Sequence, residues 1–328
     1  MTAMLRAEGL AVTFRGRHGV HARAVDGVNL DLHEGEILAL VGESGCGKTT
    51  LARTLLGLRR PSAGRVLFDG APLPSSATGL RQYRRQVQLV LQDPTGALSP
   101  RHSVYEAVAE GPRIHRLNNE QKRVADALSR VGLRPPERFF GFLPHELSGG
   151  MRQRVVIAGA LALEPRVLVA DEPVASLDAS VRGEILALLL RLRDEVGVAA
   201  LVVTHDLRLA WNIADRVAVM YLGRIVETGT VEQVLLTPKH PYTRALLSVL
   251  PESDRPPVVL AGEPPDPTRI PAGCRFHPRC PVLASDAAHV IARRCRTQDL
   301  GVLPGGGVPG VACHAVNLGD MAGEVGGH

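Results

Sequence analysis

Aromatic residues and long hydrophobic runs are both scarce in this sequence of 328 residues. Phe, Tyr and Trp make up 3% of the chain and hydrophobic residues 45%, so aliphatic side chains must fill most of its core. No apolar run approaches the roughly 18–20 residues that a membrane-spanning helix needs. The N-terminus also lacks the charged and apolar regions of a secretory signal. These absences argue against a pore within this chain, and we expect it to stay in the cytosol.

Dense runs of one charge are missing as well. The net charge is +5, and the excess is arginine scattered along the chain. A basic chain can bind nucleic acid, a nucleotide or an anionic membrane surface. Scattered arginines, however, indicate an ordinary solvated surface. The length allows two domains, or one large domain with an appendage.

Cysteine is rare until the last sixth of the chain. Cys46 lies between glycines, where it is interpreted as a small residue that fits a loop. In a reducing compartment, the clustering of the other four cysteines favours metal binding over disulfides. These four residues are Cys274, Cys280, Cys295 and Cys313.

The residues at 42–49 match the pattern G-x-x-x-x-G-K-[ST] and follow the apolar run Ile37–Val41. A strand, a glycine loop and then a helix form the context that this pattern requires. Glycines let successive backbone N–H groups form a concave anion site, and the helix adds the positive end of its dipole. Lys48 can reach the outer phosphates and the Thr49 hydroxyl can ligate Mg²⁺. The alternative, a plain glycine turn before a helix, does not explain the Lys-Thr pair.

Two carboxylates end the apolar run Val167–Ala170. Asp171 is placed to hold the Mg²⁺ shell, and Glu172 can polarise a water for attack on the γ-phosphate. A positioned base contributes about 10²- to 10⁴-fold in rate. A capped helix start is the alternative, but ligands of α/β folds bind at strand ends near such loops.

Strands alternate with helices along much of the chain, which argues for an α/β fold with a mostly parallel sheet covered on both faces. A strand is expected over 64–68, with Asp69-Gly70 as its turn. Residues 94–149 are expected to form a helical insert, with helices over 104–109 and 120–131 and a loop at Gly111-Pro112. Residues 251–328 are rich in Pro, Gly and Cys, and the cysteines are the expected organiser of this tail.

Further segments resemble the motifs of ATP-binding cassette ATPases. Together with the glycine loop and the acidic strand end, they cover residues 5–250 in the order expected for that family. They are the signature Leu147-Ser148-Gly149-Gly150 followed by Met151–Arg154, Gln92 of a Q-loop, Ser176-Leu177-Asp178 of a D-loop, the switch histidine His205, and Phe14 where the family places an aromatic ring against adenine. Phe14 also suits a core position, and His205 alone suits a polar residue after a strand.

The resemblance implies a P-loop NTPase fold over residues 1–250, with a RecA-like mostly parallel sheet, an N-terminal antiparallel β-subdomain and the helical insert. It implies ATP hydrolysis with Glu172, His205 and Gln92 as catalytic residues, and Mg²⁺ bound by Thr49, Gln92 and Asp171. The signature would complete the site of an opposite subunit, head to tail. The nucleotide-binding residues that it implies are Phe14, Gly42, Glu43, Ser44, Gly45, Cys46, Gly47, Lys48, Thr49, Thr50, Gln92, Ser148, Gly149, Gly150, Asp171 and Asp178.

Three segments are similar to importers of peptides and related solutes: Pro144–Leu147, His240–Leu247 and Gly273–Pro281. The resemblance implies a peripheral subunit at the cytoplasmic face of the membrane, with no nucleic-acid partner. Its partners would be a second ATPase subunit, a paralogue or an identical copy, together with two permeases and an extracytoplasmic solute-binding protein. An exporter ATPase, which lacks the last two segments, and a soluble cassette protein of DNA repair or translation are the alternatives.

The four clustered cysteines of the tail (residues 251–328) suit a [4Fe-4S] cluster, which the resemblance suggests, or zinc. Fourteen residues separate Cys280 from Cys295, a wider spacing than in the family pattern. His277, His289 and His314 are alternative ligands, and unligated thiols are the third possibility.

Overall fold

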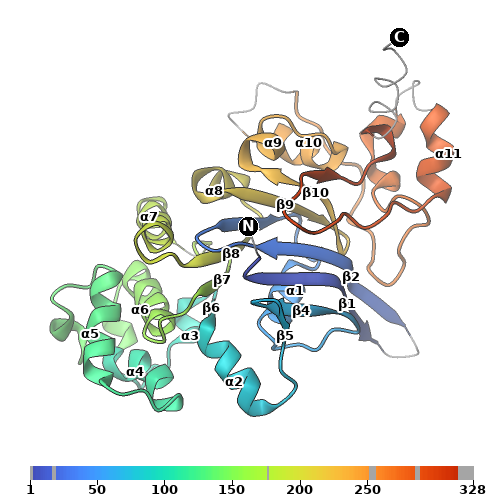
Figure 1. Cartoon of the computed structure of the whole chain (residues 1–328). Coiled ribbons are helices and arrows are strands. Elements are labelled where there is room, and N and C mark those ends of the chain that lie inside the picture. The colour runs from blue at the N-terminus through green and yellow to red at the C-terminus, as the bar shows by residue number, and fades with distance from the viewer. Residues whose placement is uncertain (1–2, 17–19, 176, 251–255, 285–288, 317–328) are drawn as a thin grey trace, which may run out of the picture. The chain divides into compact units, whose positions relative to one another are not determined.

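The computed structural model describes residues 3–16, 20–175, 177–250, 256–284 and 289–316. The chain divides into two compact units. The first unit contains residues 1–32, 38–72 and 204–328, and the second contains residues 33–37 and 73–203 (Figure 1). The C-terminal tail therefore belongs to the same compact unit as the glycine loop.

An antiparallel sheet of four strands forms one part of the first unit, in the order β2-β1-β4-β5. Asp69 and Gly70 join its last two strands with φ values of 49° and 76°. Both angles are positive, as a two-residue hairpin of the right twist requires, and the turn predicted there is confirmed. The strands are β1 (Leu5–Arg15), β2 (His21–Leu32), β4 (Ala63–Phe68) and β5 (Ala71–Pro72).

The other strands of the first unit run in the order β11-β10-β9-β3. β3 is parallel to β9, while β10 is antiparallel to β9 and to β11. Every residue of β3 is buried, which explains its continuous apolar sequence. The strands are β3 (Ile37–Val41), β9 (Arg216–Tyr221), β10 (Arg224–Thr230) and β11 (Gly310–Val311).

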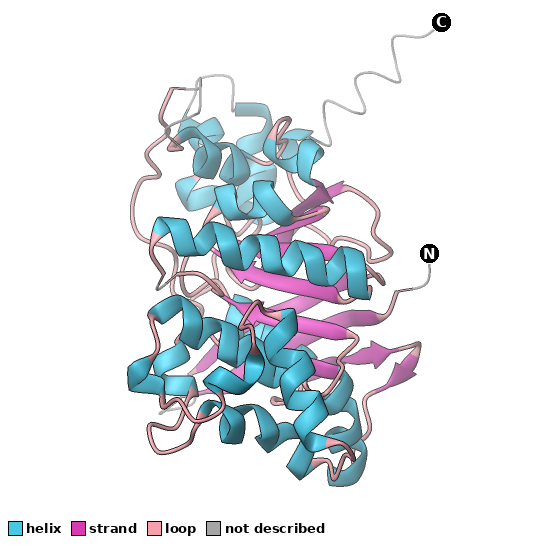
Figure 2. Ribbon diagram, turned by 90° about the vertical axis from the view of Figure 1, so that its left-hand side faces the viewer, coloured by secondary structure: helices cyan, strands magenta, loops and turns pink. Residues whose placement is uncertain are grey.

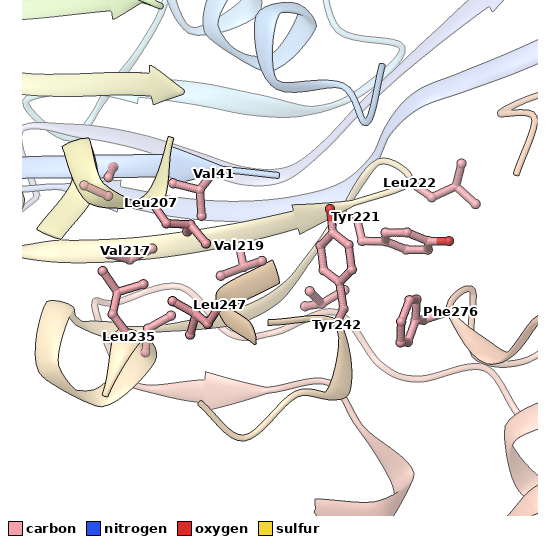
Figure 3. Packing of buried hydrophobic residues seen from close by; sticks show 14 of the residues in the cluster. Val41, Leu207, Val217, Val219, Tyr221, Leu222, Leu235, Tyr242, Leu247 and Phe276 are labelled. Carbon is pink, nitrogen blue, oxygen red and sulfur yellow. The ribbon is translucent and has the colours of Figure 1, made fainter. Parts of the chain in front are cut away.

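All helices of the first unit except the first contribute to one buried cluster with these strands, part of which Figure 3 shows. The first helix, residues 48–55, packs on β1 and β2 instead. The aromatic part of the cluster consists of Tyr221, Tyr242 and Phe276, whose ring centroids lie 4.7–5.4 Å apart. Phe276 comes from the tail, so the tail completes the core. The helices are α1 (Lys48–Leu55), α8 (Leu207–Ile213), α9 (Val231–Leu235), α10 (Pro241–Ser248) and α11 (His289–Thr297), with 3₁₀ turns at His277–Arg279 and Pro281–Ala284.

The second unit combines three parallel strands, in the order β8-β7-β6, with a helical region (Figure 2). The helices α4, α5 and α6 pack against one another in that region. Its elements are α2 (Ala77–Gln86), β6 (Val87–Val90), α3 (Pro94–Ala97), α4 (Val104–Ile114), α5 (Glu120–Arg130), α6 (Gly149–Leu161), β7 (Val167–Asp171), α7 (Ala179–Val196) and β8 (Ala199–Thr204), with 3₁₀ turns at Pro136–Phe139 and Pro144–Glu146.

The loop predicted at Gly111-Pro112 is wrong, because α4 continues through both residues to Ile114. A capping box at Ser103 and Glu106 starts this helix, and the buried residues that follow lie on one face of it. Gly111 allows that face to approach Leu163, whose side chain would lie 3.2 Å from an added Cβ. Packing in the folded protein therefore outweighs the weak helix propensity of the Gly-Pro pair.

Candidate functional site

The glycine loop between β3 and α1 can be formed only by glycine at two positions. Gly42 and Gly47 have φ values of 154° and 111°. A Cβ on Gly42 would collide with the carbonyl oxygen of Met220, and one on Gly47 with the carbonyl oxygen of Ala24. Gly47 is also the N-cap of α1. The chain can thus turn sharply from a buried strand into a helix N-terminus, which favours anion binding.

The side chain of Lys48 folds back over this loop. Its Nζ donates hydrogen bonds to the carbonyl oxygens of Gly42 at 2.6 Å and Glu43 at 2.9 Å. The residue is 7% exposed. An ammonium group held against the loop backbone can exchange these carbonyl acceptors for phosphate oxygens, which bind it more strongly because they are charged.

Helix α10, the tail and the β9–β10 turn hold the outside of the loop. The Glu43 N–H donates to the Tyr242 hydroxyl at 2.8 Å, and the Glu43 carboxylate pairs with Arg279. The Cys46 carbonyl accepts from the Gly223 N–H at 2.8 Å. Sequence reasoning did not assign Tyr242, Arg279 or Gly223 to the site. The only signal was that Tyr242 and Arg279 lie in segments singled out as marks of the importer subfamily.

Two further residues with expected roles lie in the first unit. Phe14 is half-buried in β1, and the guanidinium carbon of Arg59 lies 4.2 Å from its ring centroid, so one face of the ring carries a cation. His205 directly follows β8 and is exposed. The turn around it is fixed by Asp206, whose side chain caps α8 by accepting the N–H groups of Arg208 and Leu209.

Three expected site residues lie at one edge of the sheet of the second unit. β6 and β7 are parallel neighbours, so Gln92, which follows β6, and Asp171, which ends β7, come after adjacent carboxyl ends. Glu172 follows with a φ of 50°, and its N–H donates to the Val203 carbonyl at 2.8 Å. A non-glycine residue in the left-handed region costs energy and is typical of functional sites.

The signature residues begin the long helix α6 of the second unit. Ser148 is its N-cap and accepts the Met151 N–H at 3.2 Å, and both Ser148 and Gly149 are exposed. Gly150 is buried, and α6 lies so close to α7 at this point that a Cβ on Gly150 would collide with the Val181 side chain. Asp178 is the exposed N-cap of α7. Ser176 of the expected D-loop lies outside the described residues.

The four tail cysteines line one small cavity together with Phe276 and His240. Burial raises the pKa of Cys274 to about 12 and that of Cys295 to about 11. Among the described residues, no group of three or more His, Cys, Asp or Glu side chains is arranged to hold a metal ion. The predicted iron–sulfur or zinc site is therefore not supported.

Two of the alternative histidine ligands contact backbone oxygens through one ring nitrogen. His277 Nδ1 lies 2.9 Å from the carbonyl oxygen of Cys274, and His314 Nε2 lies 2.9 Å from that of Gln298. Across the parts of the chain that the structure describes, no helix has the length and apolar character needed to cross a membrane.

Two family models match the chain. One, described as ABC transporter, matches residues 25–175, and the other, the C-terminal region of oligopeptide/dipeptide transporters, matches residues 226–285. Among curated proteins, a putative peptide import ATP-binding protein of Brucella abortus is 42% identical, over 87% of this chain and 92% of the relative. The oligopeptide transport ATP-binding protein AppF of Bacillus subtilis is 43% identical, over 79% of this chain and 82% of its own.

Solved structures that resemble this chain agree with these family matches. The cbiO1 protein of Clostridium perfringens, part of the ABC transporter complex cbiONQ, is 35% identical, with a TM-score of 0.65 over 72% of this chain and 92% of its own. The ATP-binding cassette MJ0796, solved as a dimer bound to ADP and Pi, is 30% identical, with a TM-score of 0.62 over 70% of this chain and 99% of its own. The predicted family and its P-loop NTPase fold are confirmed. The chain belongs to the ABC transporter family and is one of its ATP-hydrolysing, ATP-binding subunits.

Proposed function

We propose that this chain drives the import of peptides or related solutes through membrane permeases by hydrolysing ATP. One observation carries the choice of solute class. The C-terminal region of oligopeptide/dipeptide transporters matches residues 226–285, and relatives that are over 40% identical are named for peptide import. The Haemophilus influenzae relative named as the dipeptide transport ATP-binding protein DppF is 41% identical over 85% of this chain.

The roles of the site residues follow from their chemistry. The backbone N–H groups of the glycine loop and the Lys48 ammonium bind the phosphates of ATP. Thr49, Gln92 and Asp171 supply the oxygen atoms that Mg²⁺ prefers, and this ion would neutralise phosphate charge. Glu172 accepts a proton from the attacking water. His205 contributes a further polar contact to the terminal phosphate.

The signature residues are proposed to act on the nucleotide of a second ATPase subunit. Ser148 and Gly149 are exposed at the N-terminus of α6, which makes them available to a phosphate outside this chain. The MJ0796 cassette was solved as a dimer with ADP and Pi. We extend the arrangement to a head-to-tail pair of this chain with a paralogue, bound at the cytoplasmic face of the membrane to two permeases that receive solute from an extracytoplasmic binding protein.

Transport by the reconstituted complex tests this proposal. The chain, a paralogous ATPase and the permeases with which it co-purifies are placed in proteoliposomes with ATP on the outside. The solute-binding protein and a tripeptide are enclosed in the lumen. We expect the peptide-loaded binding protein to stimulate ATP hydrolysis and the peptide to leave the lumen. Stimulation without the binding protein, together with transport in the opposite direction, would instead indicate an exporter.

A further inference from the structure

The carboxylate of Glu43 in the glycine loop forms a two-pronged ion pair with Arg279 in the tail. Arg279 Nη1 lies 2.7 Å from one Glu43 oxygen and Nη2 lies 3.1 Å from the other. The Arg279 side chain is 6% exposed and that of Glu43 is 25% exposed. A paired guanidinium and carboxylate fix direction as well as distance. The orientation of Glu43 is therefore set by a residue 236 positions away.

The backbone of Glu43 is held by helix α10, which precedes the tail in the sequence. Its N–H donates to the Tyr242 hydroxyl at 2.8 Å. Tyr242 is fully buried on α10, and its ring lies 5.4 Å from that of Phe276. Figure 3 shows Tyr242 and Phe276 close together, with Tyr221 beside them. Packing of the rings thus fixes the position of the hydroxyl that receives the loop N–H.

A second arginine of the tail reaches the loop through the β9–β10 turn. Arg275 Nη1 donates to the Leu222 carbonyl at 2.6 Å, and Arg275 also pairs with Asp26. The next residue of the turn, Gly223, donates its N–H to the Cys46 carbonyl. Arg275 and Arg279 therefore support the two ends of the glycine loop from one short segment, 274–280, whose terminal cysteines line the small cavity described above.

We propose that Arg279 and Tyr242 are positioning residues for ATP binding, which hold the glycine loop in the conformation that receives the phosphates. The inference rests on the ATP-binding role of that loop. Glycines make the loop free to adopt many conformations, and ordering it on binding costs conformational entropy. Contacts that order Glu43 beforehand remove part of this cost. Because they act equally on bound substrate and transition state, they lower KM and leave kcat unchanged.

Substitutions at the ion pair test the proposal in the full-length chain. ATP affinity is measured by fluorescent-nucleotide titration, and KM and kcat by phosphate release. We expect Arg279→Gln and Glu43→Gln each to raise Kd and KM for ATP at least about fivefold with kcat within about twofold of the parent. Arg279→Lys keeps the charge but loses the two-pronged contact. Its Kd and KM for ATP should therefore lie between those of the two Gln variants and those of the parent. The double variant, which carries both Arg279→Gln and Glu43→Gln, should bind ATP no more weakly than either single variant.

Arg6→Gln is the matched control. Arg6 pairs with the buried Asp31 at 2.8 Å in the same unit, and none of its ion pairs with the described residues involves the glycine loop. Its KM should equal that of the parent. Parental KM in folded Arg279→Gln, or equal KM increases in Arg279→Gln and Arg6→Gln, would overturn the proposal. If Arg279→Gln does not fold, Glu43→Gln, with its melting temperature, decides in the same way. Failure of the parent protein to bind ATP would instead overturn the function of the loop itself.

Discussion

Glu172 donates its backbone N–H to the carbonyl oxygen of Val203 at 2.8 Å while its own φ is 50°. This hydrogen bond to the neighbouring strand holds a glutamate in a backbone conformation that it would otherwise avoid. This turn ends β7 abruptly after Asp171, so the two consecutive carboxylates do not continue the alternation of a strand. We propose that the two carboxylates act separately, Asp171 on Mg²⁺ and Glu172 on the attacking water.

Glu172→Gln should separate ATP binding from hydrolysis. The amide keeps the size of the side chain but cannot accept a proton, so hydrolysis should fall by at least about 100-fold while ATP affinity stays within about twofold. Phosphate release and nucleotide titration measure the two quantities. Glu184→Gln, at an exposed carboxylate that pairs with Arg154, is the control and should hydrolyse normally. Parental turnover by Glu172→Gln would remove Glu172 from the chemical step.

Lys48→Ala should weaken nucleotide binding. The ammonium group lies against the loop carbonyls and is the only cation within residues 42–49, so its loss should raise the Kd for ATP by at least about tenfold. Isothermal titration calorimetry measures this directly. The exposed Lys122 on α5 provides the control, since Lys122→Ala leaves the loop intact. An unchanged Kd in Lys48→Ala would contradict the assigned role of the loop.

Gly47→Ala should lose ATP binding and destabilise the fold by about 1–3 kcal/mol, because the added Cβ meets the Ala24 carbonyl at a left-handed φ. Gly183→Ala makes the same chemical change within α7, where an added Cβ meets nothing within 4 Å. It should stabilise the protein by about 0.5–1 kcal/mol. Urea unfolding measures both. Equal effects of the two substitutions would mean that the loop does not need glycine at position 47.

Stability should fall as the pH drops below about 6.5, because burial lowers the pKa of His240 from 6.5 to about 3. Between these values the unfolded chain binds a proton that the folded chain does not, so stability rises with pH in this window. The loss from pH 7.5 to pH 5.5 should be about 1 kcal/mol. Urea unfolding of the parent and of His240→Gln at both pH values measures it. An identical pH dependence in the two proteins would contradict the assignment.

Features formed by residues that are close together in the sequence are predicted best. The glycine loop and the turn at Asp69-Gly70 depend on residues next to one another, and both are found where expected. The helix α2 was missed because its sequence is rich in arginine and Tyr83 is its only buried residue, so it has no apolar stripe. β11 was missed because two residues carry no detectable alternation.

The contacts around Glu43 could not be predicted in the same way. A charged residue inside a phosphate-binding loop suggests a role toward the ligand, whereas its carboxylate faces Arg279. The cysteines were expected to organise the tail by binding metal. The structure instead packs Phe276 against both Tyr221 and Tyr242, and the Tyr242 hydroxyl contacts the glycine loop. Such pairings between distant segments depend on how the whole chain folds, which local pattern does not encode.

The aromatic cluster has a consequence for how this protein tolerates shortening. Cleavage after residue 250 would remove Phe276 and Arg279, which uncovers Tyr221 and Tyr242 and strips the Glu43 carboxylate of its counter-charge. The exposed rings would favour aggregation of the truncated product. A protease that cuts after residue 250 would therefore weaken ATP binding and favour aggregation, although every residue of the recognised nucleotide-binding motifs would remain in the chain.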